Sequence, residues 1–482
     1  MSRTSKGIIW SFIERFSSQG ISFIVSIVIA RLVAPEMYGL IALITVFISL
    51  AQVFIDSGFG NALIQRQNRT EADYNTVFIF NMVIAVVLYI GFFFAAPLIS
   101  DFYDEPRLTL LTRFVALNLI ISSLSIVQRT RLNIALDFKT QAKATLIATV
   151  ISGILGIVMA YKGFEVWALV AQQLSSQAIN TIALMYYSRW QPKLQFSWTS
   201  FKSLFSFGSK LLINNLITSL YINIANLFIG KHYSAASLAF YNRGFTLSQL
   251  PSTNIEAVLQ RIIYPLTCEV QDDRERLVQT YFKYLHFSHF LILPLLTLLC
   301  VLSAPLISVL LTDKWLPAAE YVSLFCINFM FYAWIDQTGS VTNAVGRSDL
   351  NLRGTFIKRP LAFAVLFMAL GISVRAICLA TIFTSFTELI VNMYYTKKAV
   401  QITFMEQFKS QWDVLAINLL TGLAAYFAAL LFDKAIIQLI VGGTVGIVVY
   451  LCLTFVFKLE EKQLIVDYME KCMGFLKRRT ST

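Results

Sequence analysis

Apolar stretches follow one another along almost the whole chain, and short polar segments separate them. Because a helix needs about twenty apolar residues to cross the hydrocarbon core of a bilayer, the pattern predicts an all-α polytopic membrane protein with about fourteen transmembrane helices. The expected spans are 8–30, 38–60, 76–99, 110–128, 144–161, 166–187, 208–230, 240–264, 284–311, 320–343, 354–371, 374–395, 413–431 and 435–457.

Several of these stretches carry a polar face. In the first stretch the polar residues recur at helical spacing, and most fall within roughly 80° of one another. They are Ser11, Arg15, Ser18, Ser22 and Ser26. Hydrocarbon penalises an ion or an unpaired hydroxyl, so such a face is expected to meet protein or water. The stretches 38–60, 208–230, 240–264 and 320–343 are polar in the same way, whereas 354–371 and the last two read as nearly apolar. This pattern predicts polar helices around an interior cavity.

The composition agrees with a membrane protein. Of 482 residues, 57% are hydrophobic and 14% are charged, against about 25% charged in an average soluble domain. The net charge of +12 does not indicate nucleic acid binding, because the basic residues recur in short segments between apolar stretches, as in 129–143 and 347–359. This bias predicts that both termini lie on the cytoplasmic side.

The sequence offers little for metal or disulfide chemistry. Six cysteines without C-x-x-C spacing and three histidines predict neither a zinc site nor a disulfide framework, and no cofactor is expected. Glu14 and Arg15 interrupt the first apolar stretch, so a retained helix is expected there and not a cleaved signal peptide. Residues 458–482 alternate charged and apolar positions, which predicts a cytoplasmic amphipathic tail on the membrane surface; a solvated tail is the alternative.

A weak internal repeat divides the chain. The stretch from Ile8 corresponds to the one from Gly208, and Asp56 corresponds to Glu256, at an offset of 200; further on, Asn133 corresponds to Asn343 at an offset of 210. Many transporters are built from such repeats. The predicted domains are an N-terminal six-helix lobe over 1–190, a C-terminal six-helix lobe over 200–396, two additional transmembrane helices over 410–457 and the tail over 458–482.

Several motifs resemble one protein family. Residues 30–39 read A-R-L-V-A-P-E-M-Y-G and residues 56–66 read D-S-G-F-G-N-A-L-I-Q-R, as in bacterial polysaccharide exporters. The shorter motifs are Trp167–Val170, Ile229–Lys231, Tyr241–Arg243, Lys314–Trp315 and Gly346–Leu350. Together they are similar to the WzxC-like branch of the polysaccharide flippases, within the superfamily that also holds multidrug and lipid II exporters.

The resemblance implies a fold and a function. It implies two six-helix lobes around a central cavity, which move undecaprenyl-pyrophosphate-linked oligosaccharide repeat units across the bacterial inner membrane by alternating access. The repeat units would serve the synthesis of O-antigen, capsule or exopolysaccharide. Expected partners are this lipid-linked substrate, membrane lipids, and the polymerase and glycosyltransferases of the pathway.

Such a cargo suggests which polar residues bind it. Guanidinium groups pair with phosphate, and neutral polar groups pair with sugar hydroxyls. The predicted substrate-binding residues are Arg15, Ser18, Ser22, Asn215, Asn223, Gln249 and Arg261. Each has a structural alternative: an ion pair for Arg15, a snorkelling anchor for Arg261, and hydrogen bonds between helices for the asparagines.

The energy source is expected to be a gradient, because the chain has no nucleotide-binding P-loop motif. Acidic residues inside membrane spans suit coupling to protons or sodium. The predicted ion-coupling residues are Glu14, Asp56, Glu256 and Asp336, with Glu256 the first choice because it lies midway along the most polar stretch. The alternatives are a helix–helix hydrogen bond for Glu256 and a helix cap for Asp56.

Three rival functions remain. A cation-coupled multidrug exporter would share the architecture, but its cavity is expected to be acidic or aromatic. A polymerase or glycosyltransferase would be expected to show a long catalytic loop or a D-x-D-type metal site, and the chain has neither. A structural scaffold would have no use for several polar-faced helices. The sequence therefore favours a non-enzymatic, secondary-type transporter.

Overall fold

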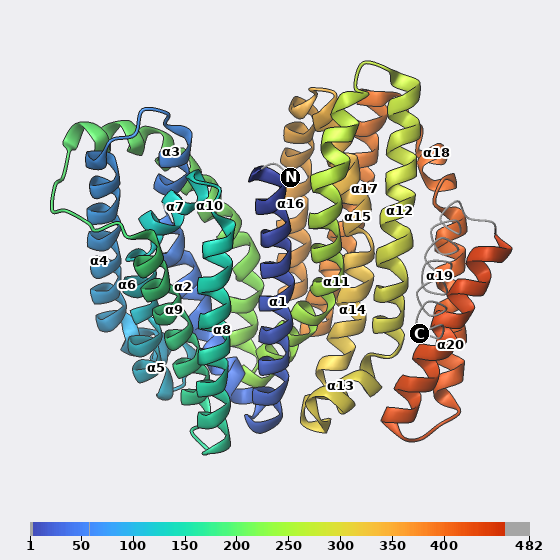
Figure 1. The fold of residues 1–482 in the computed structure, drawn as a ribbon. Coiled ribbons are helices and arrows are strands. Elements are labelled where there is room, and N and C mark those ends of the chain that lie inside the picture. The colour runs from blue at the N-terminus through green and yellow to red at the C-terminus, as the bar shows by residue number, and fades with distance from the viewer. Residues whose placement is uncertain (1–2, 57, 458–482) are drawn as a thin grey trace, which may run out of the picture. The chain divides into compact units, whose positions relative to one another are not determined.

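The structure is a computed structural model that describes residues 3–56 and 58–457, without the side chains of residues 3–16, 207, 210, 211 and 214. Over these ranges the chain forms twenty α-helices and one short 3₁₀ helix, and it has no β-strand (Figure 1). The predicted all-α architecture is confirmed. The predicted tail over 458–482 lies outside the described residues.

The described chain divides into two compact units, one up to Ala239 (unit 1) and one from Phe240 onward (unit 2). Unit 1 contains α1 (Arg3–Leu32), α2 (Pro35–Asp56), α3 (Phe59–Gln65), α4 (Glu71–Tyr103), α5 (Arg107–Val115), α6 (Leu117–Ser123), α7 (Ile126–Ile134), α8 (Phe138–Tyr161), α9 (Val166–Ser188) and α10 (Trp198–His232). The long helix α11 (Ala235–Glu269) begins in unit 1 and continues in unit 2.

Unit 2 contains the remaining helices: α12 (Arg274–Val301), α13 (Ser303–Leu311), η1 (Asp313–Trp315), α14 (Ala318–Met330), α15 (Tyr332–Ala344), α16 (Ser348–Leu370), α17 (Val374–Val400), α18 (Phe404–Lys409), α19 (Trp412–Leu430) and α20 (Ala435–Val456). In this unit α12 packs against α14, α15 and α19, and α17 packs against α14, α15 and α16. The predicted lobe limits at 190, 200 and 396 stay a prediction.

Nine helical stretches among the described residues are long and apolar enough to cross a membrane. Five further helices of 23 to 35 residues, α1, α9, α10, α11 and α16, are also long enough to do so. Each of these fourteen stretches overlaps one predicted span. The predicted limits 284–311 are wrong, because α12 runs from Arg274 to Val301 and a separate helix, α13, begins at Ser303. The five additional helices include three of those expected to carry polar faces.

The motif at residues 30–39 has a packing role in unit 1. Pro35 is the first residue of α2, where its missing N–H would have no helical partner in any case. A side chain at Gly39 would clash with the carbonyl oxygen of Ala235, so only glycine allows the starts of α2 and α11 to approach so closely. In the related motif at 229–231, Lys231 forms an ion pair with Asp104 at 3.0 Å.

The turn between α7 and α8 has the same structure as the turn between α15 and α16. Leu136 has φ 54° and Gly346 has φ 74°, 210 residues later. In each turn an amide side chain donates to an asparagine eight residues earlier: Gln141 to Asn133 at 2.8 Å, and Asn351 to Asn343 at 2.7 Å. The structure therefore confirms the 210-residue offset at this point of the repeat.

The helices that follow keep nearly the same offset. Helix α8 begins at Phe138 and α16 at Ser348, 210 residues apart, whereas α9 begins at Val166 and α17 at Val374, 208 residues apart. Earlier in the chain, the N–H of Val33 donates to the carbonyl of Ile29 and the N–H of Tyr233 to that of Ile229, at the offset of 200. Equivalent positions in the two halves can therefore be assigned helix by helix.

Candidate functional site

The predicted site residues of the first two helices have different surroundings. The side chains of Glu14 and Arg15 lie outside the described residues, so their predicted roles stay predictions. Ser18 is buried and its hydroxyl has no hydrogen-bond partner among the described residues, whereas Ser22 is exposed. Asp56 is the last residue of α2 and is exposed; its Oδ1 accepts a hydrogen bond from Gln52 at 3.2 Å.

The predicted residues of α10 and α11 also differ in their surroundings. The side-chain amide of Asn223 donates to the backbone carbonyl of Ser219 at 2.8 Å, within its own helix. Asn215 and Arg261 are exposed, and Gln249 is half-buried. The bond at Asn223 lies within α10 and joins no second helix, so both the substrate-binding role of Asn223 and its structural alternative stay predictions.

Glu256 lies at the centre of a buried polar network in unit 2. Its side chain is 2% exposed, and its Oε1 accepts hydrogen bonds from the amides of Gln260 at 3.0 Å and Gln337 at 2.9 Å. Ser340 donates in turn to Gln260 at 3.1 Å. The other oxygen of Glu256 is buried and has no hydrogen-bond partner in the part of the chain that the structure describes.

The structure brings Asp336 close to Glu256. Asp336 precedes Gln337 on α15, and the two carboxyl groups are close enough to interact electrostatically. Two of the four predicted ion-coupling residues therefore meet in one network. Two neighbouring carboxyl groups in a low-dielectric site do not both carry charge readily, so such a pair can hold a proton or a small cation. In the described chain no group of three or more His, Cys, Asp and Glu residues has the arrangement of a metal site.

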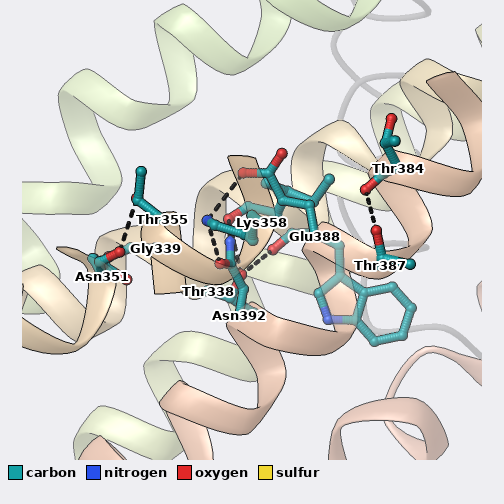
Figure 2. Close-up of polar contacts among 11 residues, drawn as sticks. Thr338, Gly339, Asn351, Thr355, Lys358, Thr384, Thr387, Glu388 and Asn392 are labelled. Atoms are coloured by element: carbon teal, nitrogen blue, oxygen red, sulfur yellow. Dashed lines mark hydrogen bonds and ion pairs between the residues drawn. The ribbon is translucent and has the colours of Figure 1, made fainter. Parts of the chain in front are cut away.

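A second charged cluster of unit 2 was missed from the sequence (Figure 2). Lys358 of α16 donates to the carboxylate of Glu388 at 3.0 Å and to the side-chain oxygen of Asn392 at 2.8 Å. The amide of Asn392 donates to the carbonyl of Ile335, at the residue before Asp336. The expectation that 354–371 is nearly apolar is therefore wrong at Lys358, whose side chain is 13% exposed.

Unit 1 contains a polar cavity of about 650 Å³, which adjoins a smaller one of about 290 Å³ and shares five lining residues with it. We call the two together the polar cavity. The larger part is lined by Thr45, Ile48, Ser49, Gln52, Asp56, Asn118, Ser122, Arg129, Gln172, Gln173, Ser176 and Gln177. The shared residues are Gln52, Asp56, Ser122, Arg129 and Gln177.

The helices of unit 1 explain how this lining forms. Residues at i, i+1, i+4 and i+5 lie on one side of a helix, so α9 presents Gln172, Gln173, Ser176 and Gln177 together. Helix α9 packs against α2 and α6, which supply Gln52 and Ser122. Ser122 donates to Gln52 at 3.2 Å. The run Q-Q-L-S-S-Q at 172–177 was the signal in the sequence, and only Asp56 of the lining was predicted.

Unit 2 contains a cavity of the opposite character, with a volume of about 730 Å³, which we call the apolar cavity. It lies among α12, α14, α15, α17, α18 and α19. Most of its lining consists of aliphatic, aromatic and methionine side chains: Leu293, Val301, Ile327, Met330, Phe331, Trp334, Phe386, Leu389, Ile390, Met393, Phe404, Met405, Phe408, Leu415, Leu419, Leu423 and Tyr426. The remaining lining residues are His289, Thr297, Asn418 and Gly422. Such a lining suits a hydrocarbon chain.

The comparisons with known proteins agree on one family. The family model described as "Polysaccharide biosynthesis protein" matches residues 28–320. The chain is 28% identical over 303 residues to the teichuronic acid biosynthesis protein TuaB of Bacillus subtilis. This alignment covers 62% of the present chain and 62% of TuaB, so the chain matches less than two thirds of the length of TuaB. It is 23% identical over 358 residues to the lipopolysaccharide biosynthesis protein WzxC of Escherichia coli, with 74% and 73% of the two chains covered.

The solved structures show the fold. The lipid II flippase MurJ in an inward closed conformation is similar with a TM-score of 0.76 and 15% identity, over 95% of this chain and 100% of that one. At this identity the likeness concerns the fold alone. The resemblance to the WzxC-like branch that the motifs indicated is confirmed by the family match and by the named relatives. This chain is a multi-pass membrane protein that belongs to the polysaccharide biosynthesis protein family.

Proposed function

We propose that the protein is a flippase that moves undecaprenyl-pyrophosphate-linked oligosaccharide repeat units across the bacterial inner membrane by alternating access. The observation that carries the proposal is that one chain holds a polar cavity of about 650 Å³ and an apolar cavity of about 730 Å³. A lipid-linked sugar has two parts with the same contrast. Its oligosaccharide needs hydrogen-bonding groups, and its polyprenyl tail needs a dry surface.

The relatives support the same cargo class. TuaB and WzxC are named for teichuronic acid and lipopolysaccharide biosynthesis, and MurJ for flipping lipid II. A drug exporter for hydrophobic cations would not need a cavity lined by four glutamines and an arginine. We therefore place the protein in surface polysaccharide synthesis, with both termini in the cytoplasm. Its partners would be the polymerase and glycosyltransferases that consume and make the lipid-linked unit.

The test is removal of the gene from its host. The proposal predicts that lipid-linked oligosaccharide accumulates on the cytoplasmic face of the inner membrane, and that a plasmid copy of the gene reverses the accumulation. The lipid would be quantified by mass spectrometry, and its sidedness by an impermeant glycosidase. Unchanged lipid-linked sugar, together with raised retention of a cationic dye, would contradict the proposal and support a multidrug exporter.

We further propose that Glu256 and Asp336 couple flipping to a proton or sodium gradient. Glu256 is buried with one oxygen unpaired among the described residues, and a second carboxyl group is its neighbour. A buried carboxylate is costly without a counter-charge, and binding of a proton or Na⁺ removes that cost. The ion would thereby stabilise one conformation of the cycle.

Proteoliposomes with imposed gradients test the coupling. The wild-type protein is expected to flip faster under one of the two gradients, whereas Glu256→Gln, which keeps a hydrogen-bond acceptor but cannot ionise, is expected to flip at a gradient-independent rate. A matched control is Glu320→Gln, an exposed acid of the same unit that pairs with Arg375. If Glu256→Gln keeps the full gradient response, the coupling site is elsewhere.

A further inference from the structure

We infer that the polar cavity of unit 1 is the subsite for an oxyanion of the substrate head group, with Arg129 as the anion partner and Asn118 as a hydrogen-bonding partner for adjacent hydroxyls. The inference rests on the proposed function, because it names the part of the lipid-linked cargo that this cavity takes. Neither residue was predicted to bind substrate, and both line the larger part of the cavity.

Among the residues that the structure describes, Arg129 is the only cationic side chain in the lining of the polar cavity. It forms no ion pair within the described part of the chain, although it interacts at longer range with Asp56. Two other basic residues of unit 1 are already engaged in ion pairs: Arg131 pairs with Glu71 at 3.4 Å and Arg66 with Asp73 at 3.1 Å. Arg129 is therefore available to a ligand, and a guanidinium prefers the planar, two-oxygen geometry of phosphate or carboxylate.

Asn118 is the second observation. Its side chain is only 8% exposed, and neither its amide nitrogen nor its oxygen has a hydrogen-bond partner among the described residues. A buried amide without partners destabilises the folded protein, so its place in the lining of a cavity points to a ligand that completes its bonds.

The repeat supplies an internal control for this argument. The residue equivalent to Asn118 at the 210-residue offset is Asn328 of α14, whose side-chain oxygen accepts a hydrogen bond from Ser385 of α17 at 2.8 Å. The side-chain oxygen of this asparagine is therefore bonded by the protein in unit 2, whereas that of Asn118 in unit 1 has no partner among the described residues. At the position equivalent to Ser385, with the 208-residue offset of α9, stands Gln177, which lines the cavity.

The rest of the lining fits sugars next to an anion. Gln52, Gln172, Gln173 and Gln177 provide donors and acceptors without charge, and Asp56 provides an acceptor for hydroxyl groups. A volume of about 650 Å³ falls within the range of about 300 to 1,000 Å³ that is typical of small-molecule sites. The oxyanion has two possible sources, the pyrophosphate of the lipid linker and a carboxylate on an acidic sugar.

Ligand-induced thermal stabilisation of the full-length protein in detergent tests the inference. The probes are undecaprenyl pyrophosphate, an oligogalacturonate that carries carboxylates but no phosphate, and a neutral maltooligosaccharide. We expect one of the two anionic probes to stabilise the wild type, and Arg129→Gln to weaken its binding about 10- to 100-fold. Arg129→Lys is expected to lose less, because it keeps the charge. Arg107→Gln, an exposed arginine of the same unit paired with Glu105, is the matched control.

The outcomes separate the two sources and the two proposals. Loss of undecaprenyl pyrophosphate binding in Arg129→Gln assigns the linker phosphate, and loss of oligogalacturonate binding assigns a sugar carboxylate. Equal binding of both probes by wild type and Arg129→Gln overturns the inference. A flipping assay with the same variants then distinguishes the failures: an active wild type with a fully active Arg129→Gln variant rejects only the subsite, whereas an inactive wild type rejects the proposed function.

Discussion

The two halves of the chain place different chemistry at equivalent positions of the repeat. In unit 1, Asp56 is exposed at the edge of an open cavity that also holds Arg129 and an unsatisfied Asn118. In unit 2 the equivalent acid, Glu256, is buried, and two glutamine amides bond to it. One scaffold therefore provides an open, neutral-to-basic site and a closed, acidic network.

This difference indicates a division of labour. A site that binds and releases a large polar head group must leave its hydrogen-bonding groups free, whereas a site that binds a proton or a small ion can be closely packed. The ion pair of Lys358 and Glu388 exists only in unit 2, because its equivalents at offsets of 210 and 208 are Ala148 and Asn180. Unit 2 thus carries an ion pair that the equivalent positions of unit 1 lack.

The largest effect is expected at Lys358. Lys358→Ala leaves Glu388 and the oxygen of Asn392 without their donor inside the helix bundle (Figure 2). Breaking a buried ion pair costs about 3 to 5 kcal/mol. Because Glu388 is partly exposed, we expect the free energy of unfolding to fall by about 3 kcal/mol. Denaturant unfolding in micelles would measure it.

The matched variant for Lys358 is the double substitution Lys358→Met with Glu388→Gln. It removes both charges while keeping similar volumes, so it is expected to be far less destabilising than Lys358→Ala. Equal losses of free energy of unfolding in the two variants would show that the ion pair is not the reason for the effect.

A smaller difference is expected between the two equivalent acids. Glu256→Ala removes the acceptor of two amide donors, at about 1 kcal/mol each, so we expect a loss of about 2 kcal/mol in the free energy of unfolding. Asp56→Ala is expected to change it by less than about 0.5 kcal/mol, because the side chain is exposed and has one long hydrogen bond. An equal or larger loss for Asp56→Ala would contradict the assignment of an open and a closed site.

The smallest effect concerns the two equivalent asparagines and has opposite signs. Asn118→Leu removes a buried amide without partners, so it is expected to stabilise the ligand-free protein by about 1 kcal/mol. Asn328→Leu removes the acceptor of Ser385 and is expected to destabilise it by about 1 kcal/mol. Thermal unfolding of both variants in the same detergent provides the comparison, and shifts of the same sign would show that Asn118 is satisfied like Asn328.

The fold was largely predictable because hydropathy has a strong local signal. In the part of the chain that the structure describes, each of the fourteen apolar stretches overlaps a long helix, and the repeat offset of 210 reappears in the turns at Leu136 and Gly346. Glu256 also stood out in the sequence, because an acid inside a membrane span is costly; its role in ion coupling stays a prediction. Asp336 was found for the same reason.

The polar cavity was not predictable to the same degree. Glutamine, asparagine and serine are individually unremarkable within a span, and Gln52, Asn118 and Gln177 come together only because α2, α6 and α9 pack against one another. Lys358 and Glu388 lie 30 residues apart on two helices, so their pairing depends on the packing of α16 against α17. Arg129 looked like one of many basic residues between spans.

The most direct test of the central claim is flipping by the purified protein alone. Full-length protein would be reconstituted into liposomes with undecaprenyl-pyrophosphate-linked oligosaccharide, and the fraction of sugar accessible to an impermeant glycosidase would be followed over time. If the protein is a flippase, the accessible fraction is expected to rise well above that of protein-free liposomes. Arg129→Gln is expected to slow this rise, and Arg107→Gln is not. Equal accessibility in liposomes with and without the wild-type protein would contradict it.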